Sequence, residues 1–249
     1  MLQTPGTLKM IDTSQFDYRR LNSHQNLKSV GLYYKNLKLV LDTGLIATLS
    51  KIYQFDTLKE NKYYLLIDTT RDLRNNSVFI QNCINIDNQL LQDGVHYAQE
   101  WFGEYHPLAV LERKYSPVIQ KPNRNFPFPD LIKDKDHSTF RYTKIRIPVN
   151  KYGTIDCCLY DKTNTRINLN ITDLENILEQ YRENIKMIIQ CDGLWFAGGK
   201  YGCNWRLLSL TWDITGENIL KIRGVQSYPC IKTGLNFNQY SFMSDSDEE

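Results

Sequence analysis

Hydrophobic and polar residues alternate along several short segments of the chain, which is typical of β-strands with one buried face. The alternation occurs in residues 31–43, 63–68, 77–87 and 140–149. In the last segment, Ile145, Ile147 and Val149 fall on one face and predict a core side. The opposite face is basic with one aromatic ring and consists of Tyr142, Lys144 and Arg146. We therefore expect four strands in these segments.

The second half of the chain predicts one helix and two hairpins. Thr172 and Glu175 have the T-x-x-E spacing of a capping box, and apolar residues follow them at helical spacing. Residues 154–160 are expected to return along residues 140–149 after a turn at residues 151–153. Two further strands, at about residues 187–213, are expected to join at a glycine turn formed by Gly198 and Gly199.

The predicted domain organisation is one elaborated domain at residues 26–240, flanked by a flexible N-terminal arm at 1–25 and a disordered acidic tail at 241–249. Five of the eight prolines lie between Pro107 and Pro129, so a basic proline-rich loop is expected at about 107–138. Many strands, one firm helix and long loops predict a mainly β (α+β) fold. A Greek-key barrel of the OB type with loop insertions fits the element order, and a β-sandwich remains the alternative.

Charge is distributed unevenly along the 249 residues. The net charge is only +2, but Ser244 to Glu249 carries four acids and no base. The remaining chain has 30 bases against 24 acids, which is a net charge of +6. The near-neutral total is therefore compatible with a polyanionic partner. No apolar run approaches the roughly 20 residues of a membrane span, so no membrane association is expected.

The sequence lacks the motifs of common catalytic and metal sites. The six cysteines include no C-x-x-C pair, and the four histidines are scattered, so we expect packed free thiols, no metal and no cofactor. The glycines before Lys200 do not form a Walker A motif, because Leu194 and Tyr201 occupy two of its required positions. Because these catalytic motifs are absent, we expect that the protein is not an enzyme. Without a secretory signal, an intracellular protein is expected. A metal-dependent nuclease remains an alternative, built on the acids Asp68, Asp87, Asp156 and Asp192.

Aromatic and basic residues concentrate near the glycine turn. Within 18 positions the chain has Trp195, Phe196, Lys200, Tyr201, Trp205, Arg206 and Trp212. Rings that stack on bases and cations that contact phosphates are what single-stranded nucleic-acid binding requires. Tryptophan is usually buried, so Trp212 and one of Trp195 or Trp205 are also candidates for the core. Lys200 and Tyr201 are expected to be exposed at the turn.

The segment IIQCDGLWFAGGKYGCNWRLLSLTW, which follows the capped helix, resembles the core of single-stranded DNA-binding proteins of nucleocytoplasmic large DNA viruses. The matching pieces are Gln190, residues 193–196, the turn at 199–202, and Trp205 with Arg206. The resemblance implies an OB fold, similar in type to the phage replication protein with an acidic C-terminal tail. The tail MSDSDEE fits this type, although it lacks the terminal aromatic residue of several such tails.

By this resemblance, the chain coats single-stranded DNA during viral genome replication, recombination or repair, in the host cytoplasm or nucleus. The expected stacking residues are Tyr142, Trp195, Phe196, Tyr201 and Trp205. The expected phosphate contacts are Lys144, Arg146, Lys200 and Arg206. The implied partners are single-stranded DNA, replication proteins that bind the tail, and further copies of the chain on DNA. The alternative function is a structural or virion-associated interaction protein whose aromatic residues form a β-barrel core.

Overall fold

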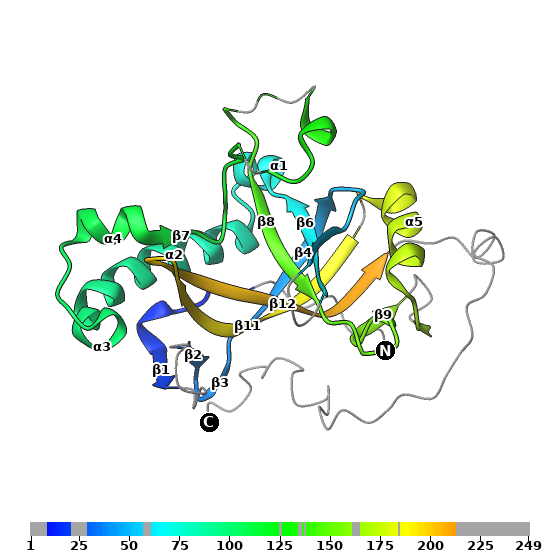
Figure 1. Cartoon of the computed structure of the whole chain (residues 1–249). Coiled ribbons are helices and arrows are strands. Elements are labelled where there is room, and N and C mark those ends of the chain that lie inside the picture. Colours follow the sequence, from blue (N-terminus) through cyan, green and yellow to red (C-terminus); the bar gives the residue numbers. More distant parts are fainter. Residues whose placement is uncertain are drawn as a thin grey trace, which may run out of the picture.

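The computed structural model of the chain describes residues 9–20, 29–56, 61–124, 126–133, 136, 138–160, 165–183 and 185–212 (Figure 1). The strands are β1 (Phe16–Arg20), β2 (Ser29–Tyr34), β3 (Leu37–Lys38), β4 (Val40–Thr48), β5 (Tyr53–Asp56), β6 (Asn61–Asp68), β7 (Tyr115–Ser116), β8 (Tyr142–Ile147), β9 (Cys158–Tyr160), β10 (Arg166–Ile167), β11 (Ile185–Ala197) and β12 (Lys200–Trp212). The helices are α1 (Thr70–Arg74), α2 (Val78–His96), α3 (Ala98–Phe102), α4 (Leu108–Lys114) and α5 (Ile171–Tyr181), with 3-10 turns η1 (Thr13–Gln15) and η2 (Pro129–Ile132). Within these residues strands outweigh helices, which confirms the mainly β class.

Five of the strands close into a barrel. β4 pairs with β6, β6 with β8, and β8 with β12, while β12 returns through β11 to β4. Every pairing in this ring is antiparallel except that of β8 with β12, which is parallel. Helix α5 lies in the connection between the third barrel strand, β8, and the fourth, β11. A closed five-stranded Greek-key barrel is the OB architecture, so the prediction of an OB-like barrel is confirmed.

Alternate side chains of the strands fill the barrel. On β8, Ile145 and Ile147 are buried, and Ile145 lies opposite the equally buried Leu65 of β6. Lys144 and Arg146 point to the other face and are half-exposed. Each buried aliphatic side chain stabilises the fold by roughly 1.5–3 kcal/mol. The alternation predicted for this segment therefore holds, with an apolar inside and a basic outside.

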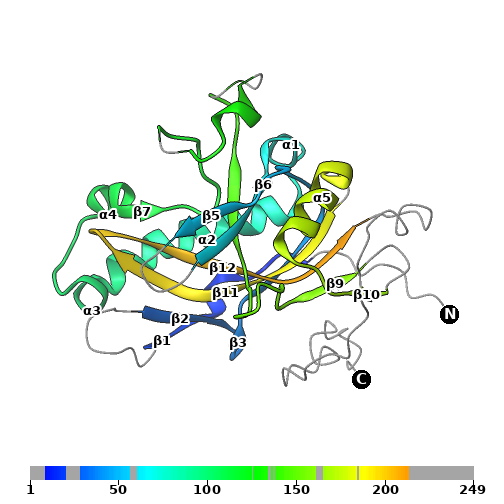
Figure 2. The ribbon, with the colours of Figure 1, turned by 45° about the vertical axis from the view of Figure 1, so that its right-hand side comes forward.

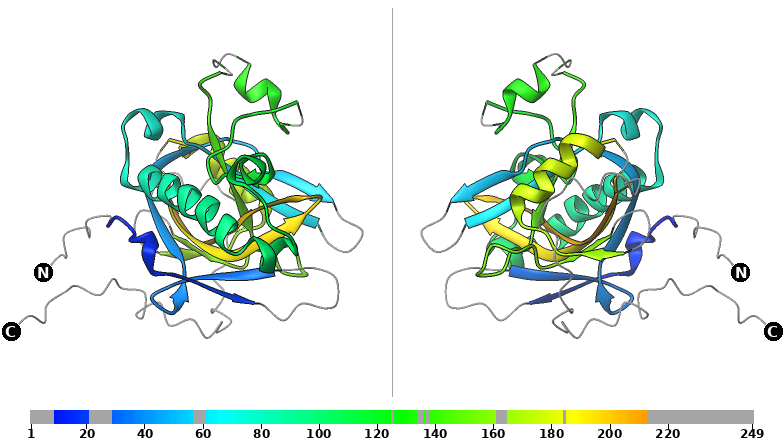
Figure 3. Two further views of the ribbon diagram at one scale, coloured as in Figure 1. Left: turned by 90° about the vertical axis from the view of Figure 1, so that its left-hand side faces the viewer. Right: turned by 90° about the vertical axis from the view of Figure 1, so that its right-hand side faces the viewer.

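The hairpin of β11 and β12 extends beyond the barrel (Figure 2). Its turn is formed by Gly198 and Gly199 with φ of +57° and +73°, which two-residue hairpin turns require, so the predicted glycine turn is confirmed. In the extension, β11 pairs with β2 at Leu194, and β12 pairs with β7 at Tyr201. Helices α2, α3 and α4 pack against one face of this extension (Figure 3). The opposite face is left without a helical cover among the described residues.

Helix α2 shows that the prediction of a strand at residues 77–87 is wrong. Its buried residues recur at helical spacing and include Phe79, Cys83, Ile86 and Leu90. A short apolar run can fit both the two-residue period of a strand and the 3.6-residue period of a helix, and the length of the run then distinguishes the two. Here the buried face continues to Leu90 and beyond, which is too long for one ordinary strand.

Asp87 of α2 fastens β7 and the following residues to this helix. Its Oδ1 atom accepts hydrogen bonds from Tyr115 Oη at 2.6 Å and from the Val118 N–H at 2.9 Å. Burial raises the pKa of the Asp87 carboxyl to about 6, although these hydrogen bonds act in the opposite direction. The start of the proline-rich segment is therefore held in place by a carboxylate that is costly to ionise.

The capping box of α5 differs from the predicted one. Asn170 is the N-cap, and its side chain accepts a hydrogen bond from the Asp173 N–H at 2.8 Å, while Asp173 accepts from the Asn170 N–H. The prediction of Thr172 and Glu175 is therefore wrong by two residues. Glu175 instead accepts from the Ile52 N–H at 2.9 Å, so it anchors the connection between β4 and β5 to the helix.

Two other predicted irregular segments contain regular structure. Residues 16–20, assigned to the N-terminal arm, form β1 and pair along their whole length with β2. The predicted loop at 107–138 contains α4, which begins directly after Pro107. Proline is compatible with this position because the first helical turn needs no N–H bond there. The predicted acidic tail at 241–249 lies outside the described residues.

The expected hairpin after β8 is only partly formed. Val149 and Ile155 make one antiparallel bridge across the turn. β9 then leaves β8 and pairs in parallel with β12, with Leu159 opposite Leu210, and antiparallel with β10. The returning strand thus extends the edge beyond β12, which the sequence alternation alone does not indicate.

Candidate nucleic-acid interface

One row of side chains crosses the outer face of the barrel. The registers place Tyr53 of β5 opposite Tyr64 of β6, and Tyr64 opposite Arg146 of β8. Arg146 is in turn paired with Arg206 of β12. Paired residues on neighbouring strands share one face of a sheet. With strands about 4.8 Å apart, the row spans about 14 Å.

Lys144 joins two rings of this row into one patch. Its Nζ atom lies 3.8 Å from the ring centroid of Tyr64 and 5.1 Å from that of Tyr53. The two rings are 6.2 Å apart, and Phe55 lies 6.3 Å from Tyr53 with 48% of its surface exposed. Burial lowers the pKa of Lys144, while the ring faces attract its charge. A cation and accessible rings are thus held together on β5, β6 and β8.

Asp192 partly neutralises the charge of Arg206, the residue at the β12 end of the row. Its Oδ1 atom accepts from Arg206 Nε at 3.1 Å and from Gln190 Nε2 at 3.2 Å. The side chains of Arg206 and Asp192 are 32% and 28% exposed, so solvent screens their attraction. Arginine has five N–H donors, and within the described part of the chain Asp192 engages the one at Nε. The terminal nitrogens of Arg206 are therefore left for an anion such as a phosphate.

Trp195 extends the same face toward the glycine turn. It pairs with Gly202, which shares a face with Arg206 because side chains alternate along β12. The ring lies over this glycine, since a Cβ atom added to Gly202 would lie 3.3 Å from Trp195 Cζ2. Trp195 is half-buried and Lys200 is exposed. We call the following set the barrel face: Tyr53, Phe55, Tyr64, Lys144, Arg146, Trp195 and Arg206.

Comparison with solved structures finds chains of low identity. A single-stranded DNA-binding protein from bacteriophage Enc34, solved in complex with ssDNA, is 14% identical, with a TM-score of 0.42 over 78% of this chain and 94% of that chain. The protein gp2.5 of bacteriophage T7, a single-stranded DNA-binding protein, is 9% identical, with a TM-score of 0.38 over 78% and 99%. No protein-family model matches the sequence, and no curated protein matches it. The resemblance to proteins of nucleocytoplasmic large DNA viruses stays a prediction.

Tyr142 does not belong to the exposed surface, contrary to the prediction. It is 7% exposed and lies in a second hydrophobic cluster with Leu66, Phe126 and Phe140. The residues that precede β8 supply half of the buried members of this cluster, namely Phe126, Ile132 and Phe140, and these pack against Leu66 and Tyr142 of the barrel strands. Phe128 of the same segment lies 6.3 Å from Tyr53, at the border between this cluster and the barrel face.

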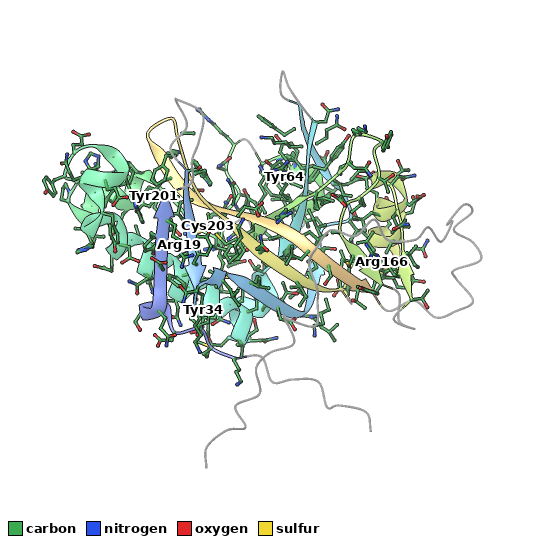
Figure 4. All side chains as sticks on the ribbon, turned by 90° about the horizontal axis from the view of Figure 1, so that it is seen from below. Arg19, Tyr34, Tyr64, Arg166, Tyr201 and Cys203 are labelled. Atoms are coloured by element: carbon green, nitrogen blue, oxygen red, sulfur yellow. The ribbon has the colours of Figure 1, made fainter. Side chains whose placement is uncertain are left out.

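Other predicted stacking residues also lie in the packed interior. Tyr201, expected to be exposed, is fully buried, and Trp205 is 3% exposed. Phe196 is half-buried, and its ring packs parallel to that of Tyr201 and against Trp101 of α3. Both rings therefore lie on the face of the hairpin opposite Trp195. Figure 4 shows Tyr201 well separated from Tyr64 of the barrel face. Trp212 and Trp205 are the core pair, so the prediction that one of Trp195 or Trp205 is buried with Trp212 is confirmed.

Sequence reasoning missed three rings of this region, namely Tyr53, Phe55 and Tyr64. Tyr64 lies on a strand that the alternation predicts. Because it is adjacent to the buried Leu65, its side chain must face the outer side of β6, and this could have identified it as a candidate. Tyr53 and Phe55 lie on β5, a short strand that the sequence analysis does not predict and that pairs with the neighbouring strand β6.

Three of the four acids that suggested a nuclease are engaged in side-chain hydrogen bonds. Asp68 accepts from the Thr70 N–H, Asp87 holds Tyr115, and Asp192 pairs with Arg206. Among the residues that the structure describes, no group of three or more histidines, cysteines or acids could hold a metal ion. The five described cysteines are free thiols, as predicted. No described helix is long and apolar enough to cross a membrane.

Proposed function

We propose that the protein binds single-stranded DNA on the barrel face. The observation that carries this proposal is the position of Lys144, 3.8 Å from the Tyr64 ring and 5.1 Å from the Tyr53 ring. Of the three strands that form this patch, β5 pairs with β6, and β6 and β8 are the second and third strands of the barrel. OB folds bind oligonucleotides on the face of these two strands and on the adjoining loops.

Binding without sequence preference follows from the chemistry of the face. Tyr53, Phe55, Tyr64 and Trp195 would stack on bases, and every base has a π-face. Lys144, Arg146 and Arg206 would contact phosphates, and Lys200 would extend these contacts at the hairpin turn. Phosphate neutralisation releases counterions, so the affinity should fall steeply as salt rises. Unstacked bases are accessible in a single strand and shielded in a duplex, which favours single strands.

We place this activity in viral genome replication, recombination or repair, at replication sites in the host cytoplasm or nucleus. The support is the resemblance of residues 188–212 to single-stranded DNA-binding proteins of large DNA viruses, together with the basic body and acidic tail. The tail at 241–249 would recruit replication proteins or compete with DNA for the basic face. Several copies along one strand would form the coating.

A fluorescence anisotropy titration with labelled oligo-dT tests the proposal. Tyr64→Ala should weaken binding by roughly 5- to 150-fold, because stacking contributes about 1–3 kcal/mol per base. The matched control is Tyr105→Ala, since Tyr105 is 79% exposed between α3 and α4, on the helix-covered side of the hairpin. Equal affinity of wild type and Tyr64→Ala, with circular dichroism showing both folded, would contradict binding at this face.

Two further experiments distinguish base stacking from general electrostatic attraction. Lys144→Gln should reduce the slope of log K against log salt by about 0.7, which is the contribution of one phosphate contact to a single strand. An unlabelled duplex should compete poorly with the labelled single strand. If the duplex competes as well as the single strand, stacking on the rings is not what drives binding, and a structural or virion-associated role becomes the better explanation.

A further inference from the structure

A cavity of about 740 Å³ lies at the other end of β6 and β8, between α1 and the residues that precede β8. Its polar lining includes three guanidinium groups and three hydroxyl groups, from Arg71, Arg74, Arg141, Thr70, Ser138 and Thr139. Arginine forks and hydroxyls are the side-chain donors that bind phosphate oxygens. The volume falls within the range of ligand sites in proteins.

Two carboxylates also line this cavity, but both are committed to the local backbone. Asp68 Oδ1 accepts from the Thr70 N–H at 3.0 Å. Asp136 Oδ1 accepts from the Ser138 N–H at 2.9 Å and from its hydroxyl at 2.7 Å. These bonds engage one oxygen of each carboxylate and shape the two loops around the cavity, while both groups keep their negative charge beside the three arginines. The acids thus build the cavity walls.

Among the described residues, the printed contacts of these guanidinium groups include no close, buried ion pair. Arg141 donates from one terminal nitrogen to the carbonyl oxygens of Ser138 and Phe140, both at 2.8 Å, which fixes the side chain but does not neutralise it. Arg71 lies 3.7 Å from Glu183, and both side chains are more than half exposed, so this pair is weak. Arg74 lies three residues after Arg71, on the same side of α1.

We propose that this cavity binds a phosphate group, and that the group belongs to the DNA backbone beyond the barrel face; the assignment to DNA rests on the proposed function. Arg141 precedes Arg146 by five residues on the way into β8, a distance of about 16 Å along the strand. A single strand that leaves Arg146 along β8 would pass the proline-rich segment and reach the cavity. The cavity then adds phosphate contacts that only longer strands can make.

The test compares oligo-dT of about 4 and about 16 nucleotides, the range of site sizes of one OB fold. The double variant Arg71→Gln/Arg74→Gln should lower the salt slope for the long oligomer by about 1.4, and affinity at 0.1 M salt by roughly 25-fold. Binding of the short oligomer should not change. Arg113→Gln on α4 is the control, because Arg113 is exposed on a helix that does not line the cavity. Arg141 is left intact because its hydrogen bonds hold the loop.

Inorganic pyrophosphate distinguishes a free anion from the DNA backbone. In a thermal shift assay it should stabilise wild type more than the double variant. If it does so while the long-oligomer slope is unchanged, the cavity binds free phosphates, and the assignment to the DNA strand is overturned. If neither readout changes, the cavity does not bind phosphate. Both outcomes leave the barrel face intact provided that Tyr64→Ala still weakens the short oligomer, so failure of this proposal is separable from failure of the proposed function.

Discussion

Replacing Asp87 with asparagine would isolate the free-energy cost of keeping a carboxylate between α2 and β7. The pKa of Asp87 is raised from 3.8 to about 6 by burial. The folded state therefore binds a proton more readily than the unfolded chain between pH 4 and pH 6. By linkage, the free energy of unfolding must fall as pH rises through this range. The stabilisation is complete below pH 4 and absent above pH 6.

The size of the effect follows from the same pKa. Each unit of pKa shift corresponds to 1.36 kcal/mol, so the free energy of unfolding can change by at most about 3 kcal/mol. Residual contact of Asp87 with water reduces this change to roughly 2–3 kcal/mol. Asparagine does not titrate, so Asp87→Asn should lack this component. Any difference between the Asn amide and the protonated carboxyl as hydrogen-bond partners of Tyr115 and Val118 adds an offset that is constant with pH.

Urea unfolding followed by tryptophan fluorescence, from pH 4 to pH 7.5, measures the difference between wild type and Asp87→Asn. The wild type should lose roughly 2–3 kcal/mol relative to the variant as the pH rises from 4 to 7. Other carboxyl groups titrate in both proteins and cancel in the difference, provided they do not interact with Asp87. A difference that stays constant with pH would refute the assignment of a raised pKa to this buried group.

Two substitutions test the packing around the barrel face. Gly202→Ala places a Cβ atom 2.7 Å from the Ser116 carbonyl oxygen, so it should separate β7 from β12 and cost about 1–3 kcal/mol in thermal unfolding; an unchanged Tm would contradict the close approach. Phe140→Ala removes a fully buried ring from the second cluster and should cost about 3–5 kcal/mol. It should also make Tyr142 accessible to iodination, and a tyrosine that stays protected would show that its burial does not depend on this ring.

The parts of the fold that could be predicted from sequence are those whose local pattern agrees with their long-range packing. The apolar face of β8 and the glycine turn between β11 and β12 follow from alternation and turn chemistry alone. Because Lys144 and Arg146 alternate with Ile145 and Ile147, their outward position was also predictable. Arg206 follows in the same way from the strand that carries it.

The failures have a common physical cause, which is competition between a local pattern and tertiary contacts. The run at Val78 fits both a strand and a helix, and its packing under the hairpin decides for the helix. Tyr201 follows a turn and therefore suggests exposure, yet β12 is regular from Lys200 onward and turns this ring toward α3. Tyr53 contributes to the barrel face because β5 pairs with the next strand, β6, and the four residues of β5 are too few to mark a strand by alternation.

The closure of the barrel between β4 and β11 has a consequence for synthesis of the chain. Tyr64 leaves the ribosome 142 residues before Arg206, which at typical translation rates is an interval of roughly 7–30 s. During that interval β4 lacks its partner β11 and β8 lacks its partner β12, so the barrel stays open. The barrel face is thus assembled only when translation of the final hairpin is complete. Folding of the barrel therefore depends on contacts between segments that are distant in sequence, and such contacts form slowly.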